Sequence, residues 1–142
     1  MIGLDTNVLA RYYIDDDADA EAQRQRVAAR RLFESGQPLM VSKSVILELE
    51  WVMRGYYGFT SNQVTSVVRH LLEQVHVTIE DRDVVEQALS NCETGIEFAD
   101  ALHHASYRVC DSVATFDDRK FARRAKRLGL APPVILVPQQ TT

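Results

Sequence analysis

The feature that most constrains the fold is the alternation of short apolar runs with longer helical patterns. The apolar runs cover residues 1–4, 39–42, 75–79, 113–116 and 134–137. Helical patterns cover residues 18–35, 44–54, 60–74 and 81–92, the stretch after Gly95 to Val109, and residues 118–128. Short continuous strands separated by helices are typical of a mostly parallel sheet covered on both faces, with right-handed crossovers. The pattern therefore predicts an α/β protein.

The length and composition favour one globular domain over residues 1–142. The formal net charge is −4, so any attraction for nucleic acid must be local rather than a property of the whole chain. Two cysteines do not suggest a disulfide framework, and we expect them to be reduced thiols. No signal peptide or membrane-spanning run is recognisable, so the sequence predicts a soluble, cytoplasmic protein without a membrane partner.

Two aspartates follow predicted strands. Asp5 comes directly after the first strand and Asp117 after the fourth. In open parallel sheets, ligands bind at the carboxyl ends of the strands, so both aspartates are candidates for a binding site. The alternative is helix capping, which suits Asp118 directly ahead of the basic helix. Capping suits Asp5 less well, because Thr6 and Asn7 can cap whatever follows.

A third acidic residue, Glu48, lies in the apolar helical segment VILELEWVM. A helical wheel predicts that Glu48 is buried near Trp51, and that Glu50 and Arg54 form an exposed pair. A buried carboxylate without a partner is costly and needs a cation. The cation is either a metal ion or an arginine from elsewhere in the chain.

A fourth acidic residue, Asp100, lies on a predicted helical stripe with Glu97, His104 and Arg108. The stripe is either solvated or part of a site, and this helix alone leaves both interpretations open. If the four carboxylates converge, their repulsion is relieved by a hard divalent cation such as Mg²⁺ or Mn²⁺. No Cys/His cluster points to zinc. Such a site suits phosphodiester hydrolysis.

Four short motifs carry a resemblance to a known family. DTNVL, ELEWV, FADAL and TFD resemble, in this order, the four blocks of PIN-domain ribonucleases, and the length is similar to that of VapC toxins. The resemblance implies catalytic, metal-ligating carboxylates at Asp5, Glu48, Asp100 and Asp117. It also implies supporting roles for Asn7 and Thr115 in orienting carboxylates or water. Glu97 matches an acidic position of the metal site that is found in some members. Some members also have a further polar or acidic residue shortly after the TFD block, for which Asp118 and Lys120 are the candidates here.

The resemblance also implies a fold, an activity and partners. The fold would be a three-layer α/β/α sandwich with a five-stranded sheet ordered 3-2-1-4-5. The activity would be hydrolysis of RNA by water with Mg²⁺ or Mn²⁺, without a covalent nucleophile, and it would inhibit translation. A homodimer and a VapB-like antitoxin that blocks the acidic cleft are implied too. The sequence does not indicate which RNA is cleaved.

Three other function classes compete with this interpretation. An aspartate-nucleophile phosphatase needs a second aspartate two residues after Asp5, where this chain has Asn7. A phospho-accepting signalling domain needs a lysine after a late strand, and none lies in or just beyond residues 134–137. A PIN-like scaffold without activity stays open.

Two surface features complete the predictions. Six basic residues lie within Arg119–Arg127, and we expect Arg119 and Arg123 to bind RNA phosphates; the alternative is a solvated basic helix. The aromatic residues Trp51, Tyr56, Tyr57 and Phe59 are candidates for docking the antitoxin. For Trp51, packing in the core is the favoured interpretation.

Overall fold

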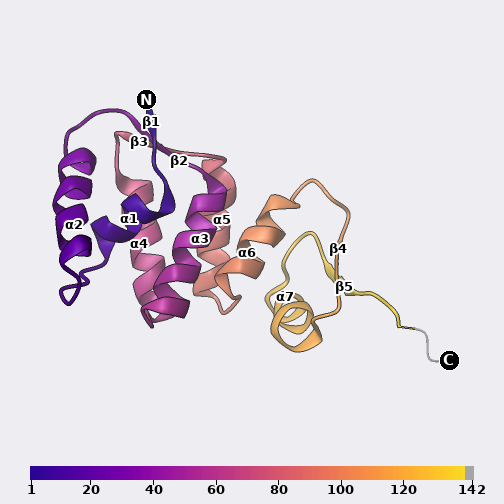
Figure 1. Cartoon of the computed structure of the whole chain (residues 1–142). Coiled ribbons are helices and arrows are strands. Elements are labelled where there is room, and N and C mark those ends of the chain that lie inside the picture. The colour runs from indigo at the N-terminus through magenta and orange to yellow at the C-terminus, as the bar shows by residue number, and fades with distance from the viewer. Residues whose placement is uncertain (140–142) are drawn as a thin grey trace. The chain divides into compact units, whose positions relative to one another are not determined.

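The computed structural model describes residues 1–139, and Figure 1 shows the course of the chain. The last three residues of the predicted domain, 140–142, lie outside the described residues. The chain divides into two compact units, Met1–Arg82 and Asp83–Thr142. Each unit has its own small parallel sheet.

The first unit is built on three short strands, β1 (Ile2–Gly3), β2 (Leu39–Val41) and β3 (Val77–Ile79). They are parallel, and β2 lies between β1 and β3. The helices of this unit are α1 (Thr6–Tyr13), α2 (Ala20–Phe33), α3 (Lys43–Trp51), η1 (Val52–Tyr56) and α4 (Ser61–Glu73). The segment η1 is a π-helical turn that continues α3.

The core of the first unit is aliphatic, with an aromatic cluster at one side. Helix α1 packs against α2 and α3 and contributes the buried side chain of Leu9. Tyr12 stacks on Phe33 with ring centroids 4.2 Å apart, and the Tyr13 hydroxyl lies 2.6 Å from Nδ1 of His70. These contacts explain why a segment with only two turns of helix is stable here, since short helices depend on tertiary packing.

Polar side chains fix where the helices of the first unit begin. Ser42 caps α3 by accepting a hydrogen bond from the backbone N–H of Val45, so the helix starts one residue before the expected start at Ser44. Of the two residues that could cap α4 by sequence, Thr60 and Ser61, Thr60 is the cap, and it forms a reciprocal capping box with Gln63.

The second unit contains α5 (Arg82–Glu93, with its first residue at the boundary), α6 (Phe98–Ser106), β4 (Val113–Thr115), η2 (Asp118–Ala122), α7 (Arg123–Leu128) and β5 (Val134–Leu136). β4 and β5 are parallel, with Val113 opposite Val134. The buried His104 on α6 places Nε2 2.8 Å from the carbonyl oxygen of Pro132, which attaches the segment before β5 to that helix.

All five predicted strands are present within the expected segments, and the orders 3-2-1 and 4-5 hold within each sheet. The predicted single five-stranded sheet differs from the structure, in which the described strands form a three-stranded and a two-stranded sheet. β1 has two residues, so few ladder hydrogen bonds specify its neighbours, and strand patterns do not specify pairing between distant segments. Helix α1 was not predicted. Within residues 1–139, no helix is long and apolar enough to cross a membrane.

Candidate metal centre

Asp5 and Glu48 line the same groove of the first unit. Asp5 follows β1 and is the N-cap of α1, because its carboxylate accepts a hydrogen bond of 2.8 Å from the backbone N–H of Thr6. The groove encloses about 410 Å³ and is also lined by Asn7, which is exposed next to Asp5. Asp5 is therefore a helix cap whose carboxylate borders an open groove, and the capping interpretation does not exclude the binding one.

The structure reverses the predicted positions of the two glutamates on α3. Glu50 is 3% exposed and accepts a hydrogen bond of 2.6 Å from Nε of Arg54. Glu48 is exposed and lines the groove, and its carboxylate has no partner among the described residues. The predicted Glu50–Arg54 pair exists, but the predictions that Glu48 is buried and that Glu50 is exposed are wrong.

The physical reason is the position of the apolar face. The buried face of α3 and η1 runs through Ile46, Leu49 and Met53, at helical spacings of three and four, and Glu50 lies beside it. The wheel assigned Trp51 to the core, whereas Trp51 is 65% exposed. With Trp51 outward, Glu48 one turn earlier is outward too.

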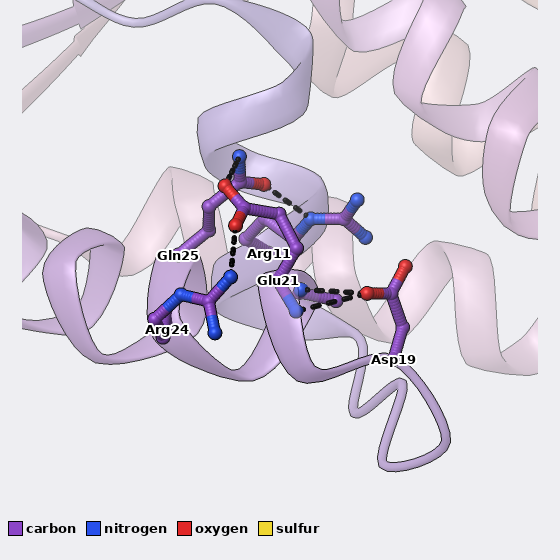
Figure 2. A network of polar contacts seen from close by, with 6 residues as sticks. Arg11, Asp19, Glu21, Arg24 and Gln25 are labelled. Atoms are coloured by element: carbon purple, nitrogen blue, oxygen red, sulfur yellow. Dashed lines mark hydrogen bonds and ion pairs between the residues drawn. The ribbon is translucent and has the colours of Figure 1, made fainter.

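The sequence analysis overlooked a polar network in the wall of the groove. The Tyr57 hydroxyl donates a hydrogen bond of 3.3 Å to Asp16 and receives one of 3.4 Å from Nη1 of Arg11. The Nε of Arg11 donates to Gln25 on α2 over 2.8 Å, and Figure 2 shows this contact. Asp19 caps α2 through the N–H groups of Glu21 and Ala22, also in Figure 2. The contacts of Tyr57 and Arg11 join residues far apart in sequence, so no local pattern reveals them.

In the second unit, Asp100 lies on α6 one turn after Glu97. Partial burial raises the pKa of the Asp100 carboxyl, and the negative charges of Glu97 and Asp117 raise it further. The positive charges of His103 and Arg124 act in the opposite direction. The repulsion shows that the structure brings Asp100, Glu97 and Asp117 within electrostatic reach of one another.

Asp117, rather than Asp118, caps the helical segment after β4. The Asp117 carboxylate accepts a hydrogen bond of 3.0 Å from the backbone N–H of Lys120, and the hydroxyl of Thr115 accepts one of 3.0 Å from the N–H of Asp117. Asp118 lies inside the first turn and accepts from Arg123 over 2.8 Å. The prediction that Asp118 is the cap is wrong, because the backbone is still extended at Asp117. Thr115 thus contacts the backbone that carries the candidate ligand.

The basic segment Arg119–Arg127 is only partly solvated. Lys120 lies 3.6 Å from Glu97, and Arg124 donates a hydrogen bond of 3.2 Å to the carbonyl of Gly95. Arg119 is exposed, and Arg123 is exposed although it pairs with Asp118. Arg124 belongs to the predicted basic segment, but the effect of its charge on Asp100 was not predicted, because only the fold reveals it.

The chemistry of these side chains fits a hard divalent ion. The candidate ligands are all carboxylates, and oxygen ligands of this kind suit Mg²⁺ and Mn²⁺. Among residues 1–139, no three His, Cys, Asp or Glu side chains are grouped closely enough to hold a metal ion. Within the described residues of each unit, the candidate carboxylates therefore do not by themselves form a complete metal site.

The comparisons decide the family. The model of the PIN domain family matches residues 2–127, and so covers parts of both units. The chain belongs to the PIN domain family. PIN domains are generally nucleases, typically use divalent metals and bind RNA. Comparisons of this PIN domain with curated proteins and with solved structures found no match.

Proposed function

We propose that this PIN domain is a Mg²⁺- or Mn²⁺-dependent endoribonuclease and the toxin of a VapBC-type toxin–antitoxin pair that inhibits translation. In this proposal both units act as one domain over residues 1–142, with the strand order 3-2-1-4-5 in the active protein. The metal ligands are Asp5, Glu48, Asp100 and Asp117, with Glu97 as a further candidate.

The observation that carries the proposal is the concentration of negative charge at the candidate residues, which basic side chains balance only in part. Asp100 is partly buried next to Glu97 and Asp117, where like charges oppose its ionisation. Glu48 is exposed in a groove with Asp5 and has no partner among the described residues. Carboxylates held together at a cost to their ionised forms are common at functional sites, and a divalent cation removes the cost.

The residues divide the chemical work as follows. The four carboxylates bind the cation. Thr115 holds the backbone N–H of Asp117, and Asn7, which lines the groove with Asp5, orients a carboxylate or a water molecule. A divalent cation bound there would lower the pKa of its bound water and neutralise negative charge on the phosphate. Arg119 and Arg123 bind neighbouring phosphates of the RNA.

The decisive experiment is RNA cleavage by the purified full chain with Mg²⁺ or Mn²⁺, with EDTA as the control and the Asp100→Asn variant beside the wild type. The proposal predicts cleavage that EDTA and the variant both abolish. Metal-independent cleavage of equal rate in both proteins would contradict it. Sequencing of RNA 5′ ends after induced expression identifies the cleaved RNA.

The contribution of the basic segment is tested by salt titration. Replacing Arg119 and Arg123 with glutamine should weaken RNA binding. It should also flatten the slope of log K against log salt concentration by the amount expected for roughly one lost phosphate contact per removed charge. The matched control is the double replacement of Arg30 and Arg31, exposed basic residues on α2. An unchanged slope in the Arg119/Arg123 variant would remove this segment from the RNA site.

The toxin role requires a partner that masks the acidic residues, since an unrestrained ribonuclease harms its own cell. We propose a VapB-like antitoxin as this partner, and a homodimer as the active form. Induced expression of the wild type should stop growth, while expression of Asp5→Asn should not. Unimpaired growth with an active ribonuclease and no antitoxin gene present would contradict the toxin role.

A further inference from the structure

We propose that Trp51 and Tyr56 form a stacking site for an unpaired RNA base beside the Asp5 and Glu48 carboxylates. This inference rests on the proposed ribonuclease function and adds to it a surface of the first unit that contacts one unpaired base. Trp51 is 65% exposed and Tyr56 is 76% exposed, and both line the groove that contains Asp5 and Glu48. Large exposed aromatic side chains next to candidate catalytic groups require an explanation.

The position of Trp51 follows from the helix. Glu48 and Trp51 are three residues apart on α3, so their side chains lie on neighbouring parts of the same face. A Cβ atom added at Gly55 would lie 3.9 Å from the Trp51 indole, so the ring extends along the helix beside Gly55. The indole therefore keeps an exposed surface within one helical turn of a candidate metal ligand.

The position of Tyr56 is supported by its neighbour. The rings of Tyr56 and Tyr57 meet edge to face, with centroids 4.8 Å apart and an interplanar angle of 68°. The Tyr57 hydroxyl is held by Asp16 and Arg11. Tyr57 thus anchors the π-helical turn that presents Tyr56, and π-helical turns occur frequently at functional sites.

The charge of the groove favours a base over a phosphate as the occupant. Asp5, Asp16, Asp19 and Glu48 line the groove, and they repel a phosphate that no cation accompanies. The basic residue of this lining, Arg11, already donates to Gln25 and Tyr57. Stacking of a base on an aromatic ring is uncharged and tolerates any base, but it needs a base that is not paired within a duplex.

The chain offers a direct probe, because Trp51 is its single tryptophan. The emission of the metal-free full chain in EDTA is titrated with a single-stranded RNA, with the same sequence as a duplex, and with an abasic ribose-phosphate strand of equal length. We expect the emission of a solvent-exposed indole, and we expect only the single-stranded RNA to quench it. Equal quenching by the abasic strand, or quenching by none of the three, would overturn the proposal.

Variants separate stacking from packing. Trp51→Ala should raise KM for single-stranded RNA roughly 5- to 150-fold with little change in kcat, the range expected from loss of one stacked base. Trp51→Phe should recover most of the affinity and Trp51→Leu little of it, because leucine is apolar but not aromatic. The control is Tyr107→Ala, a half-exposed aromatic side chain of the second unit. Equal KM values for the phenylalanine and leucine variants would overturn the proposal even if the alanine variant folds poorly.

The salt dependence separates this site from the basic segment. Loss of an uncharged contact lowers the affinity at every salt concentration and leaves the slope of log K against log salt unchanged. A flattened slope for Trp51→Phe or Trp51→Leu would therefore contradict a stacking role.

The failure of this inference is distinguishable from the failure of the proposed function. Quenching by single-stranded RNA without any cleavage would reject the ribonuclease function and retain the stacking site. Cleavage with an unchanged KM in Trp51→Ala would retain the function and reject the stacking site. An emission change on dilution of the protein alone, parallel to a change in mass, would assign Trp51 to contact between two copies of the chain and overturn the inference.

Discussion

The carboxylates of the first unit and those of the second unit lie in different surroundings. Asp5 and Glu48 share a groove with aromatic side chains. Partial burial and the negative charges of Glu97 and Asp117 raise the pKa of Asp100, and the positive charge of Arg124 lowers it. The first unit offers carboxylates and uncharged contacts, whereas the second offers carboxylates partly balanced by basic residues. The comparison therefore separates a groove lined by acidic and aromatic side chains in the first unit from a cluster of acidic and basic side chains in the second.

The largest expected effect tests whether both units serve one reaction. Asp5→Asn in the first unit and Asp100→Asn in the second should each reduce kcat/KM for RNA by about 100-fold or more, because each removes a proposed ligand of the cation. The double variant should be hardly worse than either single one, since residues that act as a unit are not additive. Full additivity in cleavage assays would mean that the units contribute independently.

The next effect concerns stability with metal. Mn²⁺ at about 100 times its dissociation constant should stabilise the wild type by about 2.7 kcal/mol, seen as a higher melting temperature. Asp5→Asn and Asp100→Asn should both lose most of this gain if the cation is held by both units. A gain lost in only one of the two variants would assign the cation to that unit alone.

Within the first unit, the two glutamates of α3 should respond in opposite ways. Glu50→Gln removes the charge that a buried hydrogen bond from Arg54 satisfies, and should reduce the free energy of unfolding by about 1–3 kcal/mol. Glu48→Gln should change it by less than about 0.5 kcal/mol, since Glu48 is exposed, but should abolish cleavage. Urea unfolding and cleavage assays on both variants check this. A stability loss confined to Glu48→Gln would contradict the positions described here.

The smallest effect is the pH dependence from Asp100. The pKa of the Asp100 carboxyl is raised above its ordinary value of 3.8, so the folded chain holds this proton more tightly than the unfolded chain does. Its contribution to stability is therefore present below pH 3.8 and is lost as the pH rises through the folded pKa. Asp100→Asn should be more stable than the metal-free wild type at neutral pH, by at most about 1 kcal/mol because the site is partly open to solvent.

Below pH 3.8 the difference should vanish, which melting curves across pH can show. The control is Asp111→Asn, at an exposed aspartate of the same unit, and its melting temperature should match that of the wild type at each pH. A wild type that is more stable than Asp100→Asn at neutral pH would show that ionised Asp100 is favourable in the folded chain.

The sequence was informative where neighbouring residues determine the position of a strand or the end of a helix. Apolar runs located the strands, and Thr60 and Gly129 correctly marked a helix start and a helix end. Predictions from the sequence were wrong where contacts between distant segments determine the structure. The wheel could not tell that Trp51 is exposed, and so it placed Glu48 on the wrong side. The arrangement of the sheets could not be predicted either, because pairing between distant strands depends on contacts across the fold rather than on the pattern of each strand.

The site was predictable in part for the same reason. Asp5 and Asp117 stand out because each follows a strand. Arg124 and Tyr57 carry no local signal, since their relevance arises from Gly95 and Asp16, which are distant in sequence. The proposed joint role of the four carboxylates stays a prediction that rests on the motifs.

The capping contacts of Asp5 and Asp117 have an evolutionary consequence. Each carboxylate accepts a backbone hydrogen bond at the start of a helical segment. Asparagine and serine cap helices about as well as aspartate does. If Asp5 and Asp117 are metal ligands, as proposed, one such substitution at either position removes the activity while the helix start is kept. Descendants of this chain that have lost activity are thus expected to persist as folded proteins rather than be degraded, and to keep whatever surfaces their partners recognise.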